Sequence, residues 1–249
     1  MRKILIIALL MTCCLSRLAL AQQHMPASGP TSAPANVDPK LWVRMVEVNA
    51  KAAKIEHLTA DFTQEKFTPL LKRPVVSVGK IVVSGASMRW DTQKPEPTVM
   101  LIRDKEVELY YPKLKVVEIY PMDEQLGSLA ASPLPRLDVL KRFFSFVEIP
   151  DESSRDRLAL KLTPIDPALG THIEQVHVLL DTTDGYILRA EMLDADGDRT
   201  VIRFSNILTG TRPAGELKID LPPDVKVTRP LDALGGQPPA GQKENGQDK

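Results

Sequence analysis

The sequence predicts an α+β fold, in which a long, curved antiparallel sheet closes over helices. Three observations predict it. One helical segment opens the ordered part, a series of short strands with period-two alternation follows, and an apolar helical segment interrupts the strands. Connections of a few residues favour antiparallel neighbours, because a parallel crossover needs about a dozen residues or more.

The chain begins with the pattern of a secretory signal peptide. Arg2 and Lys3 precede a short apolar run, and Ala19-Leu20-Ala21 offers a small-x-small cleavage site. The run is shorter than the roughly 20 apolar residues that a membrane-spanning helix needs. We therefore expect cleavage after Ala21, which removes residues 1–21 as signal peptide, and a periplasmic location. Cys13 and Cys14 lie inside this leader, so the mature chain contains no thiol, and the residues before them do not favour lipidation.

Composition divides the remaining chain into one domain and two flanks. Residues 22–39 are rich in Pro, Ala and Ser and predict a flexible linker, and residues 232–249 are rich in Gly, Pro and Gln and predict a disordered tail. The domain therefore spans residues 40–231. The whole chain has 32 basic and 32 acidic residues, and three of the basic ones belong to the leader, so the mature chain is slightly acidic. No basic surface is expected to attract nucleic acid.

The first ordered element is a helix over Leu41–Ile55. Apolar residues recur along one face of it, Asp38 is a suitable N-cap, and Pro39 suits the first helical position. The period then changes to two from His57 to Lys66, where Leu58, Ala60, Phe62 and Gln64 share one side of a strand.

Further strands follow at short spacing, in two groups. The spacing predicts strands over Val75–Ser84, Ser87–Asp91, Thr98–Arg103, Glu106–Tyr111, Lys115–Tyr120, Arg157–Thr163, Gln175–Asp181, Tyr186–Leu193 and Thr200–Leu208. Thr183-Asp184-Gly185 and Asp196-Gly197-Asp198 predict hairpin turns. Between the groups, residues 123–147 are dense in Leu and Phe and predict one or two short helices.

Several segments resemble, in order and spacing, the LolA family of periplasmic outer-membrane lipoprotein carriers. They include the first strand, with Phe62-Thr63-Gln64, the glycine-led strand from Gly79, Met88-Arg89-Trp90, Leu109-Tyr110-Tyr111-Pro112, and Leu221-Pro222-Pro223-Asp224-Val225 near the end. The resemblance covers nearly the whole predicted domain. No single motif is diagnostic, but the colinear set indicates membership.

The resemblance implies an unclosed antiparallel β-barrel, a curved half-barrel sheet covered by helices on its concave side, and it also implies a function. Such carriers hold lipoprotein acyl chains between the concave sheet and a helical lid, receive cargo from an inner-membrane ABC-type release complex, and pass it to an outer-membrane acceptor, without cofactor or metal. In one place this sequence departs from the family: Ser84-Gly85-Ala86 replaces a basic segment whose arginine helps to close the lid. That departure leaves open how the lid closes and whether a related lipid replaces lipoprotein as cargo.

The candidate site consists of apolar residues expected on the concave face and in the lid. The predicted wall residues are Phe62, Ile81, Val83, Met88, Trp90, Met100, Ile102, Leu158, Leu160 and Leu162, and the predicted lid residues are Leu140, Phe143 and Phe144. Each could equally be ordinary core. For Phe62 and Trp90, packing between sheet and helix is the simpler interpretation.

Other functions find little support in the sequence. No pair of histidines has metal-ligand spacing, and no nucleophile elbow or phosphate-binding loop occurs. Asp194-Ala195-Asp196-Gly197-Asp198 resembles the start of a calcium loop, but its glycine is misplaced, so a polar turn is expected. We predict a monomeric carrier that is not an enzyme. The open alternative is a periplasmic sensor or regulator that binds lipid or lipoprotein on the same fold, while a hydrolase with dispersed carboxylates is the least supported.

Overall fold

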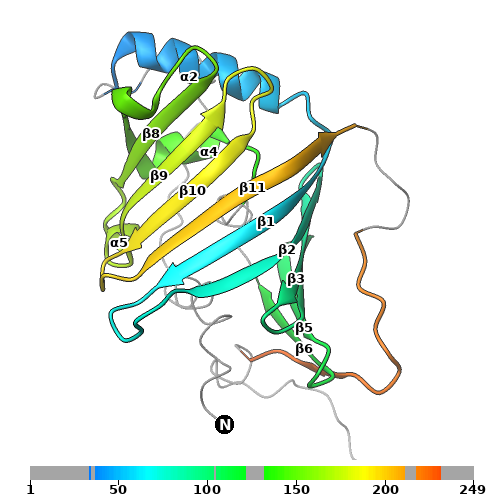
Figure 1. The fold of residues 1–249 in the computed structure, drawn as a ribbon. Helices are drawn as coiled ribbons and strands as arrows, with labels where there is room; N and C mark the ends of the chain where they lie inside the picture. The colour runs from blue at the N-terminus through cyan, green and yellow to red at the C-terminus, as the bar shows by residue number, and fades with distance from the viewer. Residues whose placement is uncertain (1–33, 35–36, 104, 122–131, 211–216, 231–249) are drawn as a thin grey trace, which may run out of the picture.

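The computed structural model describes residues 34, 37–103, 105–121, 132–210 and 217–230, and one curved sheet forms its body (Figure 1). The strands are β1 (His57–Phe67), β2 (Val75–Ser84), β3 (Ser87–Lys94), β4 (Thr98–Arg103), β5 (Glu106–Tyr111), β6 (Val116–Pro121), β7 (Phe144–Glu148), β8 (Arg157–Pro164), β9 (Ile173–Asp181), β10 (Ile187–Asp194), β11 (Arg199–Thr209) and β12 (Lys226–Thr228). The helices are α2 (Pro39–Ala52), α4 (Leu137–Phe143), α5 (Pro167–Gly170) and the 3-10 turn η1 (Pro150–Glu152).

The strands form a single 12-stranded sheet in the order β12-β6-β5-β4-β3-β2-β1-β11-β10-β9-β8-β7. Two meanders, β1 to β6 and β7 to β11, are joined where β1 pairs with β11. The sheet does not close, because β12 and β7 are its two edges. The predicted half-barrel is confirmed, with one refinement: β12 pairs with β6 in parallel, so the sheet is mixed.

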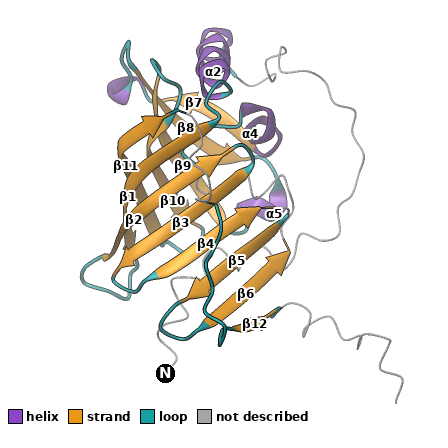
Figure 2. Ribbon diagram, turned by 90° about the vertical axis from the view of Figure 1, so that its right-hand side faces the viewer, coloured by secondary structure: helices purple, strands orange, loops and turns teal. Residues whose placement is uncertain are grey.

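The first helix begins and ends as the sequence predicts, within a few residues. The Asp38 carboxylate accepts hydrogen bonds from the backbone N–H groups of Lys40 and Leu41, at 2.8 and 3.0 Å. The apolar face of helix α2 consists of Leu41, Trp42, Met45, Val48 and Ala52, all of which are buried. Figure 2 shows α2 lying across one end of the curved sheet, with α4 beside it.

The β9–β10 hairpin turn packs against the end of α2. Gly185 has a φ of +91°, and a Cβ there would lie 2.6 Å from the backbone nitrogen of Ala52 and 2.8 Å from the carbonyl oxygen of Val48. The Lys51 ammonium donates to the carbonyl of Thr182 in the same turn. Glycine is therefore required both by the left-handed backbone and by the close approach of the helix.

The apolar insert differs from its prediction. Its described part contains one helix, α4, and then the strand β7, where a helix was expected; residues 123–131 of the insert lie outside the described residues. Phe144 and Phe146 are buried, whereas Ser145 and Val147 face outward, so the segment has period two. The adjacent rings of Phe143 and Phe144 hide this alternation in the sequence.

The chain after β11 returns along the convex face of the other half of the sheet (Figure 1). The Arg89 guanidinium donates a hydrogen bond to the backbone carbonyl of Lys218 and forms an ion pair with Asp91 at 2.7 Å. Further along the chain, β12 pairs with β6. Leu101, Tyr110 and Val117 are buried on this face. Strands β4 to β6 therefore have buried apolar residues on both faces.

Candidate functional site

The predicted wall residues all point to the concave face. Cross-strand pairing places Val83, Met88 and Ile102 in one row, and Ile81, Trp90 and Met100 in the next. Directly paired residues of antiparallel strands share a face. The structure therefore brings together the residues that the period-two pattern assigned to the wall.

The same face continues through the second meander. Leu158, Leu160 and Leu162 of β8 pair with Leu180, Val178 and Val176 of β9. These residues belong to, or pack against, the same apolar cluster as Ile81 and Trp90. One apolar surface thus extends over both halves of the sheet.

An aromatic cluster lies in the middle of this surface. The rings of Phe62 and Trp90 are 4.4 Å apart between centroids and tilted by 54°, and the Trp90 ring lies 6.1 Å from that of Phe204. Phe62 stands over Gly79, where a Cβ would lie 2.8 Å from its ring and 2.0 Å from the carbonyl oxygen of Asp91. Gly79 therefore allows the ring to lie flat on the sheet, which fits the packing role considered for Phe62 and Trp90.

Nearly all of the predicted wall residues are buried, and only Met100 is partly exposed. Ile81, Leu158 and Leu162 are 0 to 2% exposed and form the floor. The apolar side chains that are only partly buried provide the accessible surface; on the sheet they include Met100, Leu109, Val176, Val178 and Ile202. Of these, only Met100 was predicted, because partial exposure depends on how the helices lie and not on strand period.

The predicted lid residues also differ in how deeply they are buried. Leu140 and Phe143 of α4 are half-buried and pack against the apolar cluster. Phe144 begins β7 and is 6% exposed, so its ring is part of the core.

Hydrogen bonds of backbone groups hold the segment around α4, which contains two of the predicted lid residues. The Leu137 N–H donates to the side-chain oxygen of Asn49 on α2 at 2.9 Å, the Ile187 N–H to the Pro133 carbonyl at 2.7 Å, and the Ile165 N–H to the Phe143 carbonyl at 2.8 Å. These contacts attach α4 to the helix end of the sheet without a basic side chain.

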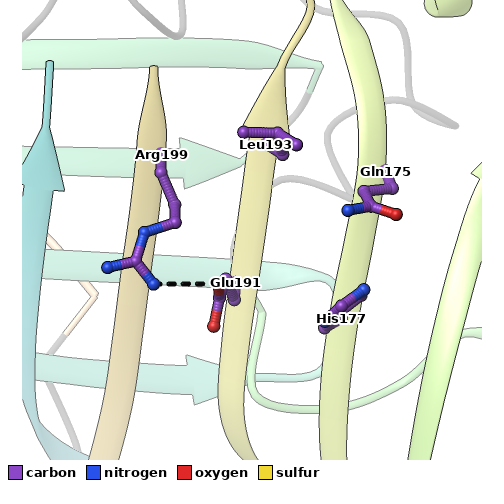
Figure 3. A pocket seen from close by; sticks show the side chains of 5 residues that line it. All are labelled: Gln175, His177, Glu191, Leu193 and Arg199. Atoms are coloured by element: carbon purple, nitrogen blue, oxygen red, sulfur yellow. Dashed lines mark hydrogen bonds and ion pairs between the residues drawn. The ribbon is translucent and has the colours of Figure 1, made fainter. Parts of the chain in front are cut away.

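Two small hollows lie elsewhere in the described part of the chain. One, of about 40 Å³, is on the convex face between Gln175, His177, Glu191, Leu193 and Arg199, where Arg199 pairs with Glu191 at 3.0 Å (Figure 3). The other, of about 140 Å³, lies at the end of α2 between Arg44, Lys51 and Arg155. Both are smaller than the roughly 300 Å³ of a typical ligand pocket, and neither is lined by a predicted site residue.

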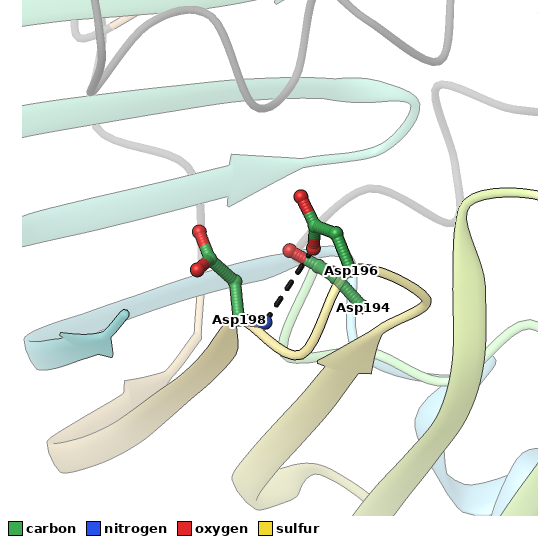
Figure 4. A group of neighbouring side chains, drawn as sticks. All are labelled: Asp194, Asp196 and Asp198. Atoms are coloured by element: carbon green, nitrogen blue, oxygen red, sulfur yellow. Dashed lines mark hydrogen bonds between the residues drawn. The ribbon is translucent and has the colours of Figure 1, made fainter. Parts of the chain in front are cut away.

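The acidic turn between β10 and β11 contains a buried carboxylate. Oxygens of Asp194, Asp196 and Asp198 lie within 4.8 Å of one another (Figure 4). The Lys66 ammonium contacts the Asp198 carboxylate at 2.7 Å and supplies a counterion from the protein itself. Burial, together with the carboxylates of Asp196 and Asp198, raises the pKa of Asp194 to about 6, although Lys66 acts to lower it. This arrangement fits a polar turn with its own cation.

A pH dependence follows from the raised pKa of Asp194. The folded chain holds this proton more tightly than the unfolded chain, so the free energy of unfolding falls as pH rises from about 4 to about 6. We expect Asp194→Asn to be more stable than the parent at pH 7.5, on the order of 2 kcal/mol, and equally stable near pH 4. Urea unfolding at several pH values measures this. Asp196→Asn is the matched control, since Asp196 is exposed; a benefit equal to that of Asp194→Asn would contradict the assignment.

The sequence matches the family described as "Outer membrane lipoprotein carrier protein LolA" over residues 53–217, well over half of the chain. The chain belongs to the LolA family. The matched region runs from just after α2 through β11, so it contains strands β1 to β11 and the α4 residues that were predicted for the lid. The family assignment from sequence is therefore confirmed.

Individual relatives are distant. An outer-membrane lipoprotein carrier protein of Bordetella pertussis is 26% identical over 184 residues, which cover 74% of this chain and 85% of that protein. Among solved structures, an uncharacterized conserved protein from Thermus thermophilus is 15% identical with a TM-score of 0.49, covering 76% of this chain and 99% of that one. A LolA superfamily protein from Nitrosomonas europaea is 12% identical with a TM-score of 0.40, covering 71% of this chain and 96% of that one.

Within the described residues, no helix has the length and apolarity needed to cross a membrane. Several polar residues on the concave face were not predicted from the sequence, among them Lys66, Tyr111, Glu118 and Tyr120. A strand pattern assigns polar side chains to the solvent face, so only the strand register could place them on the concave one.

Proposed function

We propose that this chain is a periplasmic carrier, without enzymatic activity, that shields the acyl chains of lipoproteins or of a related lipid on its concave face. The observation that carries the proposal is the continuous apolar surface across both meanders, with half-buried residues beside α4. Membership of the LolA family and relatives named as lipoprotein carriers support the same function.

The apolar face is suited to acyl chains by its energetics. Burying a chain of about 16 carbons gains roughly 13 kcal/mol before costs, at ~0.8 kcal/mol per CH₂. Association and ordering offset much of this gain, so a carrier can also release its load. A surface of Met, Leu, Val and Ile suits both shielding and transfer.

The proposed partners follow from the family. The chain would receive cargo from an inner-membrane ABC-type complex and deliver it to an outer-membrane acceptor, as a monomer. Leu140 and Phe143 would form the lid side of the site, and Met100, Leu109 and Val178 part of the sheet side. The hydrogen bonds from Leu137 of α4 to the Asn49 side chain of α2, and from Ile187 of β10 to Pro133 just before α4, would position the lid in place of the missing basic segment.

Native mass spectrometry of protein purified from the periplasm tests this proposal. We expect about one acylated lipoprotein or lipid per chain, released by extraction with organic solvent. The same chain without residues 1–21, purified from the cytoplasm, is the control, because it never meets periplasmic cargo. Periplasmic protein that carries no more acylated material than this control would contradict the carrier function.

A further inference from the structure

The carboxylate of Glu118 interrupts the apolar concave face in the first meander. Strand pairing places Ala60, Ile81, Trp90, Met100, Leu109 and Glu118 in a single row across β1 to β6. Exposure rises along this row, from buried Ile81 and Trp90 to half-buried Met100, Leu109 and Glu118. Trp90 and Glu118 are separated by three strand spacings, about 14 Å, so the row leads from the aromatic cluster to an acid near the sheet edge.

Two tyrosines on the same face hold the Glu118 side chain. The Tyr120 hydroxyl donates to Oε2 of Glu118 at 2.9 Å, and the Tyr111 hydroxyl donates to the same oxygen at 3.4 Å. Burial, with the nearby Glu118 charge, raises the pKa of Tyr120 to about 12 and that of Tyr111 further above its usual value. Both phenols therefore stay protonated and keep donating, and they fix the direction of the carboxylate.

The other carboxylate oxygen is left for a ligand. Among the described residues, both hydrogen bonds to Glu118 go to Oε2, and no Lys, Arg or His pairs with this carboxylate. Lys115, three residues before Glu118, pairs with Asp224, and Arg229, next to the β12 residue that pairs with Glu118, contacts Glu106. A carboxylate fixed beside an apolar surface attracts a cation that carries N–H donors.

We propose that Glu118 is a head-group subsite, which binds a primary ammonium group attached close to an acyl chain that lies along the Trp90–Met100–Leu109 row. This inference rests on the proposed function and adds the chemistry of the cargo. The ammonium would donate to Oε1 of Glu118, while the tyrosines hold Oε2. Either an amine-headed lipid or a lysine beside an acylated peptide terminus provides such a group.

Displacement of a bound fluorescent fatty acid by amphipaths of one chain length tests the subsite. Dodecylamine should displace the probe about tenfold better than dodecanol from the parent, since a charge-assisted hydrogen bond is worth about that factor. Glu118→Gln should remove the preference, so that dodecylamine and dodecanol displace the probe equally well. Glu108→Gln is the matched control, because Glu108 lies on the opposite face and pairs with Arg103 at 3.0 Å; it should keep the preference.

The outcomes separate this inference from the function on which it rests. If the probe itself does not bind, the acyl-binding function fails and the subsite with it. If dodecanol and dodecylamine compete equally, or if Glu118→Gln keeps the preference, the subsite alone is wrong. Should Glu118→Gln unfold, Glu118→Asp keeps the charge but withdraws it by one methylene, and it must still weaken the preference.

Two further ligands identify the natural source of the ammonium. Lysophosphatidylethanolamine, compared with lysophosphatidylcholine, tests a lipid head group, because only the ethanolamine carries N–H donors. A palmitoylated peptide with lysine, compared with the same peptide with serine, tests the protein part of a lipoprotein. A preference that requires Glu118 in one pair assigns the source, and no preference in either pair would overturn the proposal.

Discussion

Gly79→Ala is expected to lower the free energy of unfolding by about 3 kcal/mol, the upper part of the range for overpacking a core. A Cβ at this position would lie 2.0 Å from the backbone carbonyl oxygen of Asp91 and 2.8 Å from the Phe62 ring. The backbone oxygen belongs to the neighbouring strand and cannot move without breaking the β2–β3 register. The ring cannot move away freely either, because it packs on Trp90.

Urea denaturation followed by circular dichroism measures this effect. Gly170→Ala is the matched control, since nothing lies within 4 Å of a Cβ at Gly170, and we expect its free energy of unfolding to stay near that of the parent. Equal stability of Gly79→Ala and the parent would show that the aromatic cluster does not need the flat strand surface beneath Phe62.

Phe143→Asp is expected to weaken binding of a fluorescent fatty acid at least a hundredfold while leaving the chain folded. Phe143 is half-buried at the end of α4, so a carboxylate there can stay hydrated when no ligand is bound. An acyl chain against it would remove that water, at a cost of several kcal/mol. Probe titration and thermal melting of the same variant measure the two effects separately.

Two neighbouring positions provide controls. Val147→Asp places the same charge on the opposite face of β7, where the side chain is 54% exposed, and should change neither binding nor stability. Phe144→Asp buries the charge in the core, where the ring is 6% exposed, and should cost more than ~3 kcal/mol and abolish folding. Tight binding of the probe by the folded Phe143→Asp variant would show that Phe143 is not part of the lid.

The strand pattern predicts most of the fold because one face of the sheet is apolar along nearly its whole length. Where both faces are buried, the pattern fails. In β6, alternation alone would turn the apolar Val117 and Ile119 inward, yet Val117 is buried on the convex face, 1% exposed, and Glu118 faces inward. The returning chain that covers this convex face is distant in sequence, so no local pattern reveals it.

Two strands, β12 and β7, were not predicted from the sequence, and the reason differs between them. β12 has three residues that are mostly exposed, and it is fixed only by parallel pairing with β6, more than a hundred residues away. β7 follows α4 without a loop, so the helical density of the insert hides its alternation. For the candidate site, the sequence pattern identified apolar residues that lie on the concave face. It did not show which apolar residues of that face are accessible, because their exposure depends on the position of α4.

Titration of the parent chain with a fluorescent fatty acid tests most directly whether the concave face binds acyl chains. We predict saturable binding with about one probe per chain, competed by unlabelled fatty acids of similar length and weakened by Phe143→Asp but not by Val147→Asp. Absence of saturable binding to the folded chain, or binding that is unaffected by Phe143→Asp and by every other change on the concave face, would contradict it.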